Sequence, residues 1–464
     1  MFATVAWGAD QCFADEPHVV SANYEPFASE RADESIDTVS WNDDEVDTVS
    51  WNDDDFVLRS GYTYSGDACS ACGEVSCGCD PIAGCDSMGC SLSTGKLFGG
   101  GAGRLKCLGW LQAEYLMWWS SGMPTPTLLA RATEQNPEVG TALFGGPAGD
   151  LLEGLRSGMR LRAGHWLDAC QTYGIEFEYL FLGTIDESFA VGDNGAIGST
   201  VYTRPFFNAL TNQPDAELIS YPQEIRGTGR AHAEGDFHSA GVRLVWNQCR
   251  QCCDQCGPCG PIRNRSRFDV LAGYRFASLE ESLLIREDLR SLSPPAGLVF
   301  DIHDRFATTN RFHGGEIGMR WQEEYARYTL EFLGKLAFGS NRQTVHIAGR
   351  TRTNDGTTTT DSVGGLLTQT TNIGTYSRNR FALIPELGAT LGYSFRPNWR
   401  ATLGYSIIYW DRVVRPGDQI DTTLNPNLLP PAINVAGEPL RPEFRWRENG
   451  FWTQGISFGV AYTR

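Results

Sequence analysis

The chain of 464 residues lacks any run of about twenty apolar residues, which excludes a membrane-spanning helix. It has only seven histidines and no visible nucleophile elbow, which leaves little material for a hydrolase. Residues 1–9 lack the basic start and the longer apolar stretch of a signal peptide. Because the strand pattern described next requires export, we expect the gene to encode a signal upstream.

The chain is rich in segments where apolar residues alternate with small or polar ones. In the last thirteen residues Trp452, Ile456 and Phe458 point one way, since side chains of a strand change faces at every residue. The same alternation recurs at 155–164, 172–181, 268–277, 381–395 and 400–409. Tyr, Phe and Trp gather near the ends of the apolar faces, as in the aromatic girdles of membrane barrels. The pattern favours a transmembrane β-barrel over its alternative, a secreted β-sandwich.

We predict an all-β fold, an antiparallel up-and-down transmembrane barrel of about ten strands. The predicted strands are 107–119, 154–167, 171–183, 235–247, 266–278, 312–322, 325–339, 380–395, 398–411 and 450–462. Long links (120–153, 184–234, 279–311, 340–379 and 412–449) alternate with short turns and one medium Cys-rich link, 248–265. Short turns of such barrels face the periplasm, so both termini are expected there. A further hairpin in 340–379, where Val345 and Ile347 alternate with His346, would give twelve strands.

The N-terminal part of the chain is a separate acidic region. Residues 1–90 hold 19 Asp plus Glu and 2 Arg, a net charge of −17 out of −18 for the whole chain. The octapeptide Asp-Thr-Val-Ser-Trp-Asn-Asp-Asp occurs twice, beginning at Asp37 and Asp47. This composition predicts a mostly disordered extension; calcium binding by its Asp runs is the weaker alternative, because an EF-hand's Gly and Glu are missing. We therefore divide the chain into this extension (1–90), a Gly-rich linker (91–106) and the barrel (107–464).

Most of the 14 cysteines form two clusters on the side of the predicted periplasmic turns. They are Cys69, Cys72, Cys77, Cys79, Cys85 and Cys90, then Cys249, Cys252, Cys253, Cys256 and Cys259. In an oxidising compartment such spacing favours disulfides, and zinc is the alternative. Cys256-Gly-Pro-Cys259 has the letters of a thioredoxin motif, but redox catalysis requires a helix N-terminus after a strand.

The non-apolar face of the predicted strands carries charges of both signs. The candidate lumen-facing charges are Arg156, Arg160, Arg162, Glu176, Glu178, Asp269, Arg275, Glu331, Lys335, Glu386 and Arg400. Opposite charges on neighbouring strands satisfy one another in a narrow barrel; selection of ions is the alternative reading. A barrel of this size is largely filled by side chains, so a wide pore is not expected.

The best candidate for catalysis is Asp301 and Asp304 with His303 and His313. Two His and two Asp within thirteen residues could bind a metal or transfer protons, although such residues in a loop are usually solvated. We predict no enzyme activity, no metal site and no cofactor.

Several pieces of the sequence share one family resemblance. They are Trp110-Leu-Gln-Ala-Glu-Tyr-Leu-Met-Trp-Trp119, Arg160–Tyr179 around Gly164-His165-Trp166, Asp269-Val-Leu-Ala-Gly-Tyr-Arg275, Phe306–Gly315, Gly388–Ser394 and Asn425–Pro430. In their order these pieces resemble the planctomycete outer-membrane β-barrel family of unknown function, over about residues 105–464. The resemblance implies a barrel in the outer membrane and assigns no functional residue.

We therefore expect an outer-membrane protein of a Gram-negative-type envelope, either porin-like or structural. Its long loops make an adhesin or surface receptor the alternative. The expected partners are outer-membrane lipid, the barrel-assembly machinery and envelope or surface molecules bound by the loops, with no nucleic acid.

Overall fold

The computed structural model describes residues 109–167, 171–248, 264–433 and 435–463. The acidic extension, the linker and both cysteine clusters lie outside the described residues, so the predictions made for them stay predictions.

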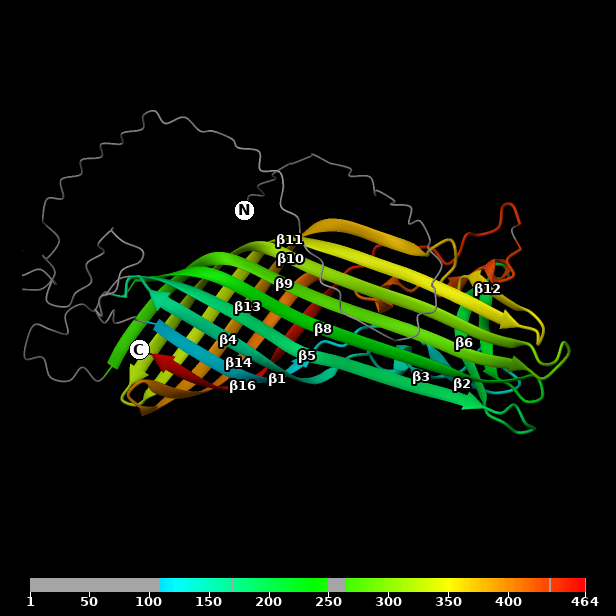
Figure 1. The fold of residues 1–464 in the computed structure, drawn as a ribbon, viewed down its shortest axis with the longest axis horizontal. Helices are drawn as coiled ribbons and strands as arrows, with labels where there is room; N and C mark the ends of the chain where they lie inside the picture. The colour runs from blue at the N-terminus through cyan, green and yellow to red at the C-terminus, as the bar shows by residue number, and fades with distance from the viewer. Residues whose placement is uncertain (1–108, 168–170, 249–263, 434, 464) are drawn as a thin grey trace, which may run out of the picture. The chain divides into compact units, whose positions relative to one another are not determined.

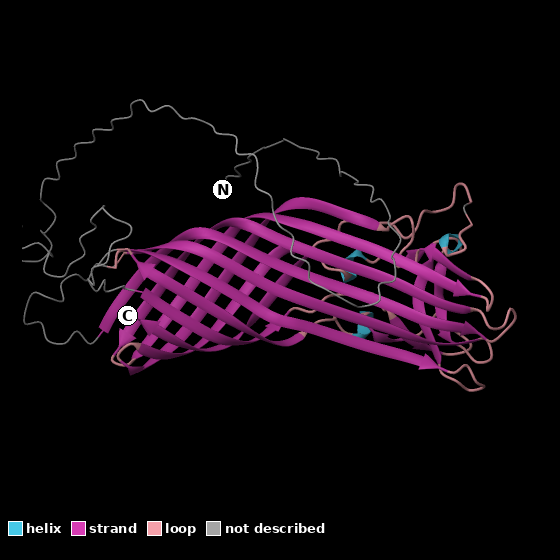
Figure 2. Ribbon diagram, viewed as in Figure 1, coloured by secondary structure: helices cyan, strands magenta, loops and turns pink. Residues whose placement is uncertain are grey.

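Ten strands form a closed antiparallel barrel (Figure 1; Figure 2). They are β1 (Gly109–Ser120), β4 (Gly154–Trp166), β5 (Tyr173–Asp193), β8 (Ile225–Asn247), β9 (Asn264–Ser291), β10 (Val299–Tyr325), β11 (Tyr328–Asn354), β13 (Gly374–Arg396), β14 (Trp399–Val413) and β16 (Asn449–Thr463). Each pairs with the next, and β1 pairs with β16 from Trp110 to Ser120, which closes the ring. The predicted ten-stranded barrel is confirmed. Within the described ranges no helix is long and apolar enough to cross a bilayer.

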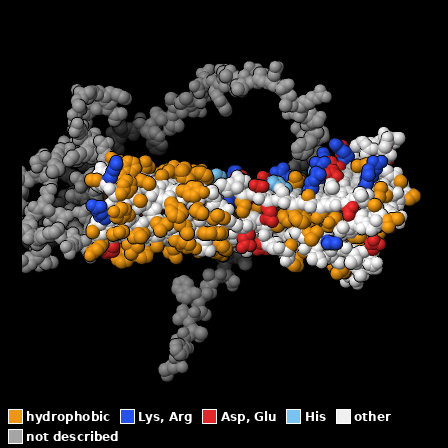
Figure 3. All heavy atoms as spheres, turned by 90° about the horizontal axis from the view of Figure 1, so that it is seen from below, with side chains coloured by type: hydrophobic (Ala, Val, Ile, Leu, Met, Phe, Trp, Pro, Cys, Tyr) orange, Lys and Arg blue, Asp and Glu red, His pale blue; other side chains and the backbone are white. Residues whose placement is uncertain are grey.

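One end of the barrel carries Gly109 and Thr463; we call it the terminal end and the opposite one the distal end. On the face seen in Figure 3, hydrophobic side chains cover most of the half next to the terminal end. The outer positions of this half carry exposed apolar residues on strands from all sides of the ring, such as Leu111, Leu244 and Leu387, and together they form an outer apolar band. Outward aromatic rings pair across strands at its edge, for example Tyr173 with Trp246 at 6.3 Å and Tyr328 with Tyr393 at 5.4 Å between ring centroids. Such a band edged by aromatic residues is the surface that a barrel presents to lipid.

The wall of the barrel is uneven in height. Strands β14, β16, β1 and β4 have 12 to 15 residues, whereas β8 to β13 have 23 to 28 apart from the short β12. The predicted long link 279–311 is therefore wrong: β9 and β10 are joined by residues 292–298 alone. The links predicted at 184–234 and 340–379 shrink in the same way, to 194–224 and 355–373.

The prediction of these links failed because the alternation changes sense above the band. There the outer face meets water and carries polar side chains, while Ile285, Phe306 and Val345 are buried on the inner face. A search for outward apolar residues therefore ends each strand too early. The twelve-stranded alternative is also wrong, since Val345 and Ile347 belong to β11 and pair with β13.

The links at the distal end fold into a small sheet of their own. It contains β2 (Leu129–Ala132), β3 (Thr141–Phe144), β6 (Val201–Asn208), β7 (Gln213–Ser220) and β15 (Thr423–Leu424), while β12 (Thr359–Val363) pairs antiparallel with the end of β11. Their apolar side chains share one core with the inner wall, in which Leu129, Ile219 and Leu424 are fully buried beside Phe306. Burial of each large apolar side chain contributes roughly 1.5–3 kcal/mol, so this core fixes the links inside the wall.

Candidate functional site: the filled lumen

A belt of buried charges crosses the lumen in the half near the terminal end. Lys335 lies at its centre: the Nζ atom is 2.8 Å from Oε1 of Glu178 and 2.9 Å from Oε2 of Glu386. Glu178 also receives Arg243 at 3.1 Å, and Glu386 receives Arg275 at 2.8 Å. Every carboxylate in this group is thus shared by several cations on different strands, which offsets the cost of taking them out of water.

The belt joins strands from all sides of the ring. Arg160 and Arg162 on β4 approach Glu114 on β1 at 3.7 and 3.6 Å, and Arg162 reaches Glu331 on β11 at 3.2 Å. Arg320 on β10 binds Glu176 on β5 at 2.7 Å. The belt therefore connects opposite walls of the barrel through ion pairs.

The structure places all eleven predicted charges on the inner face, but in three separate settings. The belt and its edge contain Arg160, Arg162, Glu176, Glu178, Asp269, Arg275, Glu331, Lys335 and Glu386. Arg156 lies farther from the terminal end and donates to the backbone carbonyls of Gly183 and Gly235. Arg400 lies at the terminal mouth, 3.8 Å from Glu324.

Four further belt residues were not among the predicted ones: Glu114, Arg243, Glu316 and Arg320. Each lies at an inward-pointing position of a strand that the sequence predicts. Applying that alternation to every charged residue of the predicted strands would have found them.

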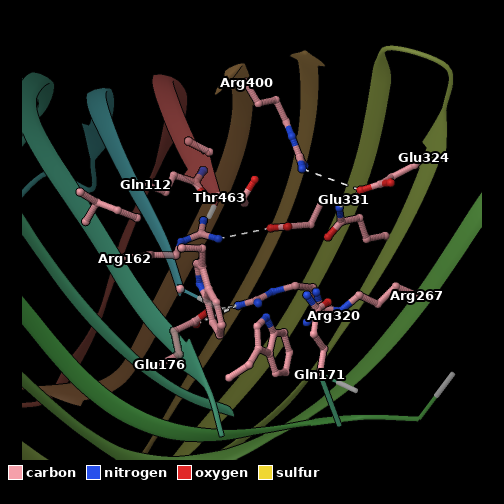
Figure 4. A pocket seen from close by; sticks show the side chains of 16 residues that line it. Gln112, Arg162, Gln171, Glu176, Arg267, Arg320, Glu324, Glu331, Arg400 and Thr463 are labelled. Atoms are coloured by element: carbon pink, nitrogen blue, oxygen red, sulfur yellow. Dashed lines mark hydrogen bonds and ion pairs between the residues drawn. The ribbon is translucent and has the colours of Figure 1, made fainter. Parts of the chain in front are cut away.

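The terminal mouth opens into a cavity of about 240 Å³ above the belt residues (Figure 4). Arg162 and Glu331 face each other across it, and Arg320 reaches Glu176 on its floor. Trp166 lines one side beneath Arg267, whose guanidinium carbon is 4.3 Å from the ring centroid. The cavity is a shallow vestibule that ends at the belt.

Beyond the belt, an apolar layer fills the lumen. It consists of Leu116, Trp118, Leu180, Leu182, Phe237, Ala277, Leu279, Phe312, Ala337, Ala382, Ile384, Ile408, Trp410, Val413 and Phe451. The exposed fraction of Trp118, Phe312 and Trp410 is 0%. Phe237 and Phe451, from β8 and β16, meet with ring centroids 5.4 Å apart. In the described barrel these side chains therefore form one closely packed apolar layer across the lumen.

Two loop arginines lock the distal links onto the inner wall. Arg204 on β6 binds Glu287 on β9 and, at 2.7 Å, Asp304 on β10. Arg415, just after β14, binds Glu281 on β9 with Nε 2.9 Å from Oε2 and also donates to the carbonyl oxygens of Ser121 and Gly122. Asp304 further accepts from the backbone N–H groups of Leu367 and Thr368.

The structure does not bring the four candidate catalytic residues together. Asp304 is fully buried on the inner face, whereas Asp301 and His303 lie on the outer face with Nε2 of His303 2.6 Å from the Asp301 carboxylate. His313, ten residues further along β10, pairs instead with the hydroxyl of Tyr274 at 2.5 Å. Within the described parts of the chain no group of three or more His, Cys, Asp or Glu side chains is arranged to hold a metal ion.

Comparison with known proteins identifies a family. The family described as "Putative beta barrel porin-7 (BBP7)" matches residues 110–463. No curated protein sequence matches the chain.

The chain is also similar to solved structures of outer-membrane barrels. The outer membrane protease OmpT from Escherichia coli is 9% identical, with 77% of this chain and 97% of that chain covered and a TM-score of 0.35. The transport unit of the autotransporter AIDA-I from Escherichia coli is 9% identical, with 80% and 94% covered and a TM-score of 0.22. The Pseudomonas putida toluene transporter TodX is 8% identical, with 77% and 89% covered and a TM-score of 0.17. Superpositions this poor carry no argument about function.

The family match confirms the resemblance to an outer-membrane β-barrel family; the planctomycete attribution stays a prediction. The matched residues include all ten barrel strands except Gly109, so the match rests on the barrel itself. The chain is an outer-membrane β-barrel protein, and it belongs to the BBP7 family of β-barrel porins.

Proposed function

We propose that this protein is a sealed barrel that anchors its loop-filled distal half at the cell surface. The observation that carries the proposal is that three layers of side chains fill the lumen one after another: the charged belt, the apolar layer and the distal core. A diffusion pore requires a water-lined passage, and each of these layers alone interrupts one. Anchoring requires only the outer apolar band and a rigid distal half, both of which the fold supplies.

Liposome swelling tests the seal. Full-length protein in vesicles is expected to admit neither sugars nor amino acids, while an established general porin in the same vesicles admits both. Trp410→Ala is expected to stay closed as well, because the belt and the distal core still block the lumen. Swelling by the wild-type protein would show an open porin and refute the sealed barrel.

A channel that opens on a signal is the second candidate, because the family is described as a porin family and the lumen is filled in this state. The terminal vestibule would be its entrance. Planar-bilayer recording over a range of voltages separates the two functions, since a sealed anchor gives no conductance steps at any voltage.

The proposed orientation places the terminal end in the periplasm and the distal end outside the cell. The tight turns 326–327 and 397–398 at the terminal end support it, because short turns of such barrels are periplasmic. An epitope inserted at Gly356, where nothing lies within 4 Å of an added Cβ, is expected to bind antibody on intact cells. An epitope at Asn398 is the control and is expected to bind only after permeabilisation. The reverse labelling pattern would overturn the orientation.

The proposed role needs no catalysis. The division of Asp301, His303 and Asp304 between the two faces of β10 supports this part of the proposal. An adhesin or receptor role for the distal links is compatible with anchoring, and binding of labelled protein to whole cells before and after deletion of 355–358 would reveal it.

A further inference from the structure

The distal edge of the apolar band is marked by one transverse row of outward side chains. Strand pairing aligns Phe276 on β9 with His313 on β10, then Ser340 on β11 and Phe381 on β13. Phe381 is among the most exposed large hydrophobic residues of the wall, with an exposed fraction of 58%. Aromatic residues at this position lie at the depth of lipid headgroups.

Two arginines stand in the next row, directly opposite each other. Arg311 on β10 pairs with Arg342 on β11, and both project outward from strands whose neighbouring outward residues face lipid. One row is two residues, about 7 Å along the strand, so the guanidinium groups begin just beyond the aromatic edge. This is the level at which the phosphate of a lipid headgroup lies.

Small polar side chains surround the two arginines. Asn379 on β13 completes the row of Arg342, and the row beyond contains Thr309, Thr344 and Ser377 on β10, β11 and β13. The hydroxyls of Thr344 and Ser377 are 3.1 Å apart. Three hydroxyl groups and an amide next to two guanidinium groups provide several donors for the oxygens of one phosphate.

The charges around the pair are unbalanced in favour of an anion. Glu280 lies 3.4 Å from Arg311, on the β9 side. Arg342 forms no ion pair within the part of the chain that the structure describes. Two like charges directly opposite each other on neighbouring strands are destabilising, and an anion between them removes that repulsion.

We propose that Arg311 and Arg342 form a binding site for the phosphate group of a membrane lipid, with Thr309, Thr344, Ser377 and Asn379 as further donors. The lipid's acyl chains lie along the apolar band below, against Phe381 and its neighbours. Under the proposed orientation this site is in the outer leaflet. Arginine suits the role because its planar, always charged guanidinium binds phosphate through two parallel hydrogen bonds.

Spin-labelled phosphatidic acid tests the site. The full-length protein is reconstituted in phosphatidylcholine vesicles at low salt, and electron paramagnetic resonance gives the relative affinity for labelled phosphatidic acid over labelled phosphatidylcholine. The double variant Arg311→Gln/Arg342→Gln is expected to lose about fivefold in this ratio for each arginine removed, and Arg342→Gln alone about fivefold. Inorganic phosphate equal in amount to the lipid phosphate is expected to leave the wild-type ratio unchanged.

The matched control removes two other arginines from the same outer face of β11. Arg350 and Arg352 lie eight and ten residues beyond Arg342, about 26 Å or more along the strand and far from any headgroup. Arg350→Gln/Arg352→Gln is expected to keep the wild-type ratio, and a heat-dependent gel shift shows that both double variants are folded. An unchanged ratio in Arg311→Gln/Arg342→Gln, an equal loss in the control, or displacement by inorganic phosphate would overturn the site.

Discussion

Replacing Arg415 by Met should destabilise the distal half of the barrel. The side chain of Arg415 is 1% exposed and ties three segments together: its own link, the carboxylate of Glu281 on β9, and the carbonyl oxygens of Ser121 and Gly122. Glu281 has no other ion-pair partner among the described residues. Methionine keeps most of the volume of the arginine stem, so the expected loss reports the charge and its hydrogen bonds rather than a cavity.

The size of the loss follows from what remains buried. Breaking a buried pair and leaving one charge behind costs about 3–5 kcal/mol. The two carbonyl oxygens that lose their donor add to this cost, which places Arg415→Met in the upper half of that range. Removing the charge as well, in Arg415→Met/Glu281→Leu, should restore most of the lost stability, because an apolar pair can replace a buried ion pair at little cost.

Urea-dependent unfolding of the full-length protein in vesicles, followed by Trp fluorescence, measures the free energies of unfolding of the wild type, Arg415→Met, Glu281→Leu and the double variant. Protease cleavage within 414–448 is a local readout and should be faster in Arg415→Met than in the double variant. The double variant could instead lose as much stability as the sum of the losses in Arg415→Met and Glu281→Leu. That result would refute the proposed ion pair, because the effects of substitutions on stability add for independent residues and not for coupled ones.

Three further predictions concern the belt and the distal core. Lys335→Met should cost less than Arg415→Met, about 3 kcal/mol in the same unfolding assay, because Glu178 keeps Arg243 at 3.1 Å and Glu386 keeps Arg275 at 2.8 Å; a larger loss than for Arg415→Met would contradict the shared-carboxylate argument. Gly365→Ala should destabilise by about 1–3 kcal/mol and expose 364–373 to protease, because an added Cβ would collide with Oδ1 of Asp304. Gly334→Ala serves as its control, because an added Cβ there would have no atom nearer than 3.7 Å. Burial, together with the nearby carboxylate of Glu287, raises the pKa of Glu217 to about 8. A raised pKa in the folded state means that the stabilising proton is fully present below the unfolded value near 4.5 and is lost as the pH rises through about 8. Protease resistance of the β6–β7 region should therefore fall in the wild type as the pH rises from about 4.5 to about 8 and level off above about pH 8, and it should depend less on pH in Glu217→Gln.

The sequence predicts the membrane-embedded half well because one physical rule governs it. In the lipid band the outer face must be apolar and the inner face filled, so alternation alone locates strands such as β16 and puts Arg160 and Glu178 inside. The contacts within the belt are a different matter. Lys335 and Glu178 are 157 residues apart, and no local pattern indicates which of the inner charges meet across the lumen.

The distal half escapes sequence prediction because its environment reverses. Ile285 and Phe306 point inward there, as in a soluble protein, while Arg286 and Asp301 face water and pair at 3.3 Å. The same strand thus obeys the membrane rule over one half and the soluble rule over the other. If apolar residues are sought first on the outer face and then on the inner face of the same strand, the pattern extends β9 and β10 to their true ends.

The filled lumen and the reversed alternation have a common physical consequence. An inner wall that turns apolar above the membrane cannot stay hydrated, so the links must fold inward and cover it, as Leu129, Ile219 and Leu424 do. Once the links are inside, the buried carboxylates of the wall need partners. Arg204 and Arg415 of the links form ion pairs with them. A conducting member of this fold would have to remove the apolar layer, the distal core and both arginine clamps together. Single substitutions are therefore not expected to open the lumen. In a series of variants that first deletes links 194–224 and 414–448 and then alters the apolar layer, conductance should appear only at the last step.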